Sequence, residues 1–65
     1  MSEMPIVGRV VRDSTTECLI KKGMYWNIEV VDIRWFKNDK PTNKGIRLNI
    51  EEANYLLEIL RRELE

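Results

Sequence analysis

Most of the chain alternates between apolar and polar residues, which is the pattern of β-strands with one covered face. β-branched and aromatic residues recur at every second position, and the alternation predicts four strands, at about residues 5–12, 16–25, 29–37 and 44–49. The last segment, about residues 50–64, has apolar residues at helical spacing instead. The sequence therefore predicts a single α+β domain over residues 1–65, with a four-stranded antiparallel sheet followed by one amphipathic helix.

Several positions predict interruptions of these strands. Gly8 is expected to mark a bulge or a close backbone approach, and Gly23 a bulge or a turn. The polar segment 38–43, which holds Pro41, is expected to be a loop. Apolar residues also change from even to odd positions near Val31, so a bulge or tight turn is expected between residues 27 and 31.

The third and fourth strands each show two chemically different faces. One face is apolar and is expected to face the helix; it carries Val31, Ile33, Trp35, Ile46 and Leu48. The opposite face carries Asp32, Arg34, Phe36 and Arg47. An arginine beside a phenylalanine on an uncovered sheet face suggests a binding surface, and Asp32 is interpreted as an ion-pair partner that holds Arg34 in place.

The helix has its own start signal and an unusually wide apolar surface. Asn49 is a good N-cap, and Glu52 stands where a capping box needs it. The apolar arc covers roughly 200°, about twice the ~100° that covering one sheet requires. One side is expected to cover the sheet and the other to meet a second copy, with a homodimer interface at Tyr55, Leu56, Ile59 and Leu60.

Length and composition narrow the chemistry. The chain has 65 residues, one cysteine and no histidine, so a disulfide framework, a Cys/His metal site and a Ser-His or Cys-His pair are excluded. We expect no enzymatic activity, no catalytic residue, no cofactor, no metal and no small-molecule substrate. The apolar runs are too short to span a bilayer, and a single thiol fits a reducing compartment. The expected location is the cytoplasm, at the nucleoid or, in a eukaryote, in the nucleus.

Charge is divided unevenly along a chain whose formal net charge is zero. Residues 1–50 carry nine basic and six acidic side chains, a net +3, whereas residues 51–65 carry a net −3. Cations interleaved with aromatic rings are typical of single-stranded nucleic-acid binding. The candidate binding residues are Arg9, Lys21, Lys22, Tyr25, Trp26, Arg34, Phe36, Lys37, Lys40, Lys44 and Arg47.

The segments VDIRWF and KPTNKGIRLN together resemble the single-stranded-DNA-binding core of the positive cofactor four family of transcriptional coactivators. Matching positions are Asp32, Ile33, Arg34, Lys40, Pro41, Lys44, Gly45, Ile46 and Leu48, and the pattern continues through Asn49, Glu51, Leu56 and Glu58. Two positions depart from the family pattern. Lys37 and Ala53 stand where the family has tryptophans.

The resemblance implies a fold and a function. The four-stranded sheet would be curved, the helix would pack on one of its faces, and two copies would pair through their helices. The sheets would bind single-stranded DNA, or RNA, with little sequence preference. By position, Arg9, Arg34 and Lys44, with Lys40, would contact the nucleic-acid backbone. The alternatives are a small protein-interaction adaptor of the transcription machinery and, less favoured, a dimeric repressor that reads duplex DNA.

Overall fold

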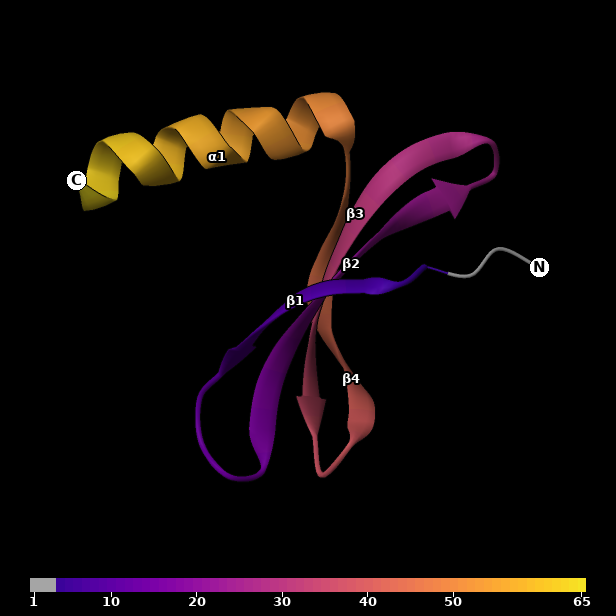
Figure 1. Cartoon of the computed structure of the whole chain (residues 1–65), viewed down its shortest axis with the longest axis vertical. Coiled ribbons are helices and arrows are strands. Elements are labelled where there is room, and N and C mark those ends of the chain that lie inside the picture. Colours follow the sequence, from indigo (N-terminus) through magenta and orange to yellow (C-terminus); the bar gives the residue numbers. More distant parts are fainter. Residues whose placement is uncertain (1–3) are drawn as a thin grey trace.

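The computed structural model describes residues 4–65, which form an open antiparallel sheet and one C-terminal helix (Figure 1). The strands are β1 (Ile6–Val11), β2 (Thr16–Tyr25), β3 (Ile28–Lys37) and β4 (Lys40–Asn49), and the helix is α1 (Ile50–Leu64). Strands that follow one another in sequence are neighbours in the sheet, in the order β1-β2-β3-β4. The predicted architecture of four antiparallel strands followed by one helix is confirmed.

The turn between β3 and β4 is shorter than the predicted loop. β4 begins at Lys40, and the turn consists of Asn38 and Asp39, which both have positive φ, 52° and 64°. Two such residues match the right-handed twist of a hairpin. Pro41 is accommodated because β4 is an edge strand, where a missing N–H disrupts no ladder. The prediction of a loop over residues 38–43 was therefore wrong.

The hairpin of β2 and β3 is continuous, also in contrast to the prediction. Every residue from Thr16 to Tyr25 pairs with a residue of β3 without a change of register, so Gly23 is neither a bulge nor a turn. The chain reverses direction in a turn at Trp26 and Asn27, which begins one residue before the predicted interval of residues 27–31. The change of apolar phase is not a slip within β3. Ile28 and Val30 lie on one side of the sheet and Val31 and the apolar residues after it on the other, so β3 is apolar on both sides near this turn.

Two glycines mark local features of the sheet. The β1–β2 register shifts between Ile6 and Gly8, which confirms the predicted irregularity. Gly45 in β4 lies against β3, and a Cβ atom there would be 2.5 Å from the backbone oxygen of Ile33 and 2.9 Å from the Cα of Arg34. These are backbone atoms, so position 45 has no room for any side chain unless the two strands move apart.

Helix α1 begins directly after β4. Asn49 accepts a hydrogen bond from the Glu52 amide at 2.8 Å, and the Glu52 side chain accepts one from the Asn49 amide at 2.9 Å, so the predicted capping box is confirmed. Since β4 runs straight into α1, the chain lacks the short loop that usually folds a helix back onto a sheet. Figure 1 shows α1 extending away from the end of the sheet. No helix within residues 4–65 combines the length and the apolar character needed to cross a membrane.

The helix does not cover the apolar face as expected. Within the described chain, α1 contacts only β3 and β4, and none of its residues is buried. The buried apolar residues among residues 4–65 are Cys18, Leu19 and Val30. Large apolar side chains on the sheet and the helix stay exposed, among them Val10, Ile46, Leu57 and Leu60. One copy of this chain therefore buries very little apolar surface for its size.

Replacing Gly45 by alanine should lower the stability of the fold. The added methyl group must push β3 and β4 apart, and overpacking of this kind typically costs about 1–3 kcal/mol in the free energy of unfolding. Urea denaturation followed by circular dichroism measures the change. Gly8→Ala is the matched control, because a Cβ at position 8 meets nothing within 4 Å. Equal stability of the two variants would contradict the close approach at Gly45.

Candidate nucleic-acid interface

The strand register divides the sheet into two faces. Residues directly opposite one another on paired strands point to the same side. On one side, which we call the open face, lie Arg9, Leu19, Lys21, Tyr25, Asp32, Arg34, Phe36 and Arg47. On the other, which we call the apolar face, lie Cys18, Ile20, Val31, Ile33, Trp35, Ile46 and Leu48. The predicted division of β3 and β4 into these two faces is confirmed.

A buried carboxylate holds two arginines at the centre of the open face. Asp32 is 6% exposed, and its Oδ1 lies 3.4 Å from Nε of Arg47 and 3.7 Å from Nη2 of Arg34. Within residues 4–65 this Oδ1 accepts no hydrogen bond, so the attraction is one of charge. Arg34 also donates from Nη1 to the backbone oxygen of Thr42 at 3.1 Å. Asp32 therefore holds both guanidinium groups in place. Each side chain is still partly accessible to solvent, with 29% of Arg34 and 37% of Arg47 exposed.

Thr42 of β4 positions Arg34 through hydrogen bonds of its hydroxyl and its backbone oxygen. The β3–β4 register shifts between Arg34 and Phe36. At this irregularity the Thr42 hydroxyl donates to the backbone oxygen of Trp35 at 2.7 Å and accepts from the Lys44 amide at 3.2 Å. The same residue thus joins β3 to β4 and presents its own carbonyl oxygen to Arg34. Sequence reasoning missed Thr42, because its role depends on a bulge that residue pattern does not reveal.

Each aromatic ring of the open face has a cation beside it. The Arg47 guanidinium lies 4.2 Å from the centre of the Tyr25 ring, and the Lys21 ammonium lies 5.4 Å from the centre of the Phe36 ring. Both distances are within the range of cation–π attraction. The face therefore alternates flat rings and positive groups across β2, β3 and β4.

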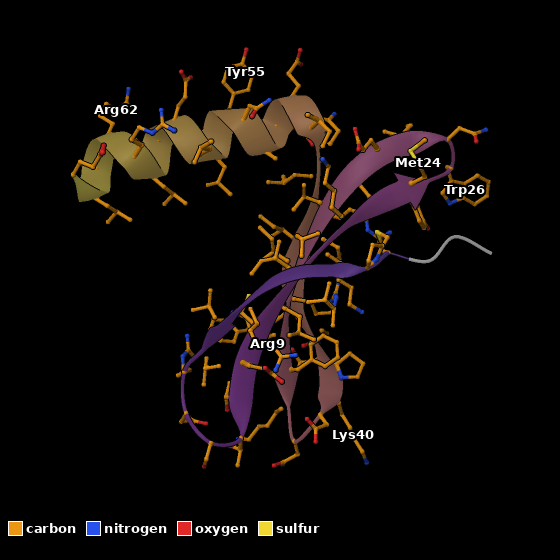
Figure 2. All side chains as sticks on the ribbon, in the orientation of Figure 1. Arg9, Met24, Trp26, Lys40, Tyr55 and Arg62 are labelled. Atoms are coloured by element: carbon orange, nitrogen blue, oxygen red, sulfur yellow. The ribbon has the colours of Figure 1, made fainter. Side chains whose placement is uncertain are left out.

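The turn between β2 and β3 presents a second aromatic group. Trp26 is 80% exposed at the tip of this hairpin, where Figure 2 shows its side chain beside Met24 and far from Lys40. Its ring meets that of Tyr25 edge to face, with centres 6.0 Å apart. Hydrogen bonding by the Trp26 side chain, and then by Arg47, lowers the pKa of Tyr25 below its ordinary value. A tryptophan with φ of 54° is unusual, since bulky residues rarely adopt positive φ.

Not all the predicted binding residues reach the open face. Those that do are Arg9, Lys21, Tyr25, Arg34, Phe36 and Arg47. Lys22 lies opposite Val31 on the apolar face and pairs with Glu29 at 3.6 Å. Lys37 and Lys40 face each other beside the β3–β4 turn, and Lys44 lines a cavity with Trp35. Arg9 is already paired with Glu17 at 3.4 Å, so it is a weaker candidate than Arg34 and Arg47.

Arg12 is a further cation that the sequence did not single out. Arg12 stands in the connection between β1 and β2, and its guanidinium lies 4.0 Å from the centre of the Trp35 ring. Trp35 was expected on the apolar face, covered by the helix, but it is only half-buried, and Arg12 instead lies over its ring. Only the contact with Trp35 distinguishes Arg12 from other surface arginines, and that contact joins the connection after β1 to β3, far apart in the sequence.

Comparisons of this chain with protein-family models, with curated proteins and with solved structures found no match. What the open face can do therefore follows from its own geometry. It presents two fixed arginines, a lysine and two rings on three neighbouring strands. Such a surface suits an extended ligand with repeated negative charges and flat groups.

Replacing Asp32 by asparagine should loosen both arginines while keeping the side-chain volume. We expect the free energy of unfolding to fall by about 1–3 kcal/mol, the usual range when a buried charged partner is lost and its neighbours can still reach water. Chemical denaturation measures this value. Glu65→Gln also removes one negative charge, but at the exposed end of the chain, and should have little effect. An unchanged stability in Asp32→Asn would mean that the carboxylate does not hold the two arginines.

Proposed function

We propose that this protein binds single-stranded nucleic acid on the open face, with single-stranded DNA as the main ligand and RNA as the alternative. The observation that carries the proposal is the alternation of Arg34, Arg47 and Lys21 with the Phe36 and Tyr25 rings on three neighbouring strands. Unpaired bases expose flat surfaces that stack on such rings, and the phosphates between them attract the cations. The resemblance of VDIRWF and KPTNKGIRLN to the positive cofactor four family supports the same function.

The cation–π pairs fit this role because they can be exchanged for nucleic-acid contacts. A base that stacks on Phe36 takes the place of the Lys21 ammonium, which then becomes available to a neighbouring phosphate. Arg34 and Arg47 stay where Asp32 holds them, so less ordering of side chains is needed on binding. The contacts involve phosphates and ring faces, which carry little base identity, so weak sequence preference follows.

A fluorescence anisotropy titration with labelled oligothymidine tests this function. The logarithm of the affinity should fall linearly with the logarithm of salt concentration, with a slope of about −0.7 for each phosphate neutralised. Phe36→Ala should weaken binding by roughly 1–3 kcal/mol, the usual value of one stacked base. Duplex of equal length should bind more weakly, because its bases are already stacked.

Two adjacent lysines provide a sharp control. Lys21 lies on the open face, whereas Lys22 lies on the apolar face and is paired with Glu29. Lys21→Ala should make the salt slope shallower by up to about 0.7, and Lys22→Ala should leave it unchanged. Equal effects of both substitutions would place the ligand elsewhere. Binding of an acidic protein but of no oligonucleotide would favour the adaptor function instead.

We also propose that two copies associate through α1. The exposed apolar side chains of the helix include Tyr55, Leu57, Ile59, Leu60 and Leu64, with exposed fractions of 46–79%. Figure 2 shows Tyr55 and Arg62 on the side of α1 that points away from the sheet. A 65-residue chain that buries three apolar residues within its described part has little stability of its own. A second copy would cover the helix and enlarge the core.

Replacing Ile59 by aspartate should weaken both assembly and folding, because a charge would be buried between the two helices. Sedimentation equilibrium should give twice the chain mass for the unmodified protein and a shift towards monomer for the variant. Asn54→Asp introduces the same residue on the polar side of the helix and should leave the mass unchanged. A folded monomer at micromolar concentration would contradict the proposed dimer.

A further inference from the structure

A second charged site lies at the end of the sheet farthest from α1, on the side of the apolar face. It is a cavity of about 470 Å³, a volume within the range typical of ligand sites. The β1–β2 and β3–β4 turns both lie at this end (Figure 1). Its walls include Arg12, Trp35, Phe36, Lys37 and Lys44. None of the residues of the open face except Phe36 contributes to it.

The positive groups of this cavity lack partners. Among residues 4–65, Arg12, Lys37 and Lys44 form no ion pair with a carboxylate. The one carboxylate in the wall belongs to Asp13, and its Oδ1 already accepts hydrogen bonds from the amides of Thr15 and Thr16, at 2.9 and 2.8 Å. These bonds, that of Thr15 first, lower the pKa of Asp13. Asp13 is thus engaged with its own turn, and the cations remain available to an anion.

The shape of the Arg12 contact indicates which anion fits. The guanidinium lies over Trp35 at 4.0 Å, which fixes the plane of the group while its N–H donors make no hydrogen bond to other residues of the described chain. A guanidinium held in this way presents paired donors that match the oxygens of a phosphate or a carboxylate. Lys37 and Lys44 add positive charge, and their ammonium groups can bind a phosphate from many directions.

Phe36 connects this cavity with the open face. Its ring has the Lys21 ammonium beside it on the open face and also forms part of the cavity wall. This is the place where the β3–β4 register shifts, between Arg34 and Phe36. A strand stacked on Phe36 would therefore have its next phosphates close to Lys37 and Arg12.

On the basis of the proposed function, we infer that this cavity binds a phosphate of the same single strand. The strand passes Phe36, turns around the end of the sheet and continues onto the opposite side, where Arg12, Lys37 and Lys44 hold it. The binding path is then longer than the open face alone. It also gives Lys44 a role in binding although Lys44 lies on the opposite side of the sheet from Arg34.

The inference is tested with Arg12→Gln and two oligothymidines, of about 5 and 15 nucleotides, which lie within the ~4–16 nucleotides that single-strand sites cover. For the longer oligomer, the affinity should fall roughly three- to tenfold and the salt slope should become shallower by about 0.7. The loss should be smaller for the shorter oligomer. Arg61→Gln removes the same charge near the end of α1 and serves as the control, with no expected change. Lys44→Gln is a second, independent variant that should reproduce the effect if Arg12→Gln impairs folding.

The outcomes separate this inference from the proposed function. If Lys21→Ala weakens binding while Arg12→Gln and Lys44→Gln have no effect, the open face binds nucleic acid and the second site is overturned. If the loss is equal for both oligomers, the cavity does not extend the path and the inference also fails. If no oligomer binds the unmodified protein, both proposals are wrong. Titration with thymidine monophosphate completes the test, because tighter binding of the free nucleotide than of the oligomer would overturn the continuous path.

Arg12→Lys adds a readout that a purely electrostatic role would not change. Lysine keeps the charge but not the planar group over Trp35, so the salt slope should be retained while the affinity falls. In a Trp26→Phe background, the remaining Trp35 reports directly on the cavity through its fluorescence. The long oligomer should change this emission, and the change should be smaller in Arg12→Lys. Unaltered Trp35 emission on saturation would place the strand away from the cavity.

Discussion

The unbroken pairing of β2 with β3 is the interaction on which the rest of this structure depends. All ten residues of β2 pair with β3, and β1 and β4 are edge strands added to this central hairpin. The buried residues Cys18, Leu19, Val30 and Asp32 all belong to these two strands. The central hairpin thus forms the small core and also fixes the face on which Arg34 and Phe36 stand. The stability of the sheet and the proposed binding surface therefore have the same physical origin.

Much of this fold could be predicted because alternation reports directly on burial of a sheet face. The strands β1 to β3 and the start of α1 at Asn49 followed from local patterns, since alternation and capping act over a few residues. The start of β4 could not be predicted in this way. Asn38, Asp39 and Pro41 all favour loops locally, but a two-residue turn and an edge position satisfy them within a hairpin.

The candidate site was less predictable, because its contacts join distant parts of the chain. Alternation placed Arg34, Phe36 and Arg47 on one face, and the parity of Asp32 suggested its ion pair with Arg34. The second ion pair of Asp32, with Arg47, depends on the β3–β4 register, which the sequence did not define. The same applies to Arg12 over Trp35, and to Lys22, which a one-residue difference places on the opposite face from Lys21.

The direct junction between β4 and α1 has a consequence for how this chain can change in evolution. Asn49 ends the strand and caps the helix, so the two elements share one residue as their boundary. Inserting or deleting a single residue there would rotate the helix by about 100° relative to the sheet. A change of one residue within the end of β4 would also move the neighbouring side chains to the opposite face of the sheet. The turns at residues 13–15 and 38–39 are free of this double penalty. Length variation among relatives of this chain should therefore accumulate at the turns, while the number of residues from the start of β4 to α1 stays constant.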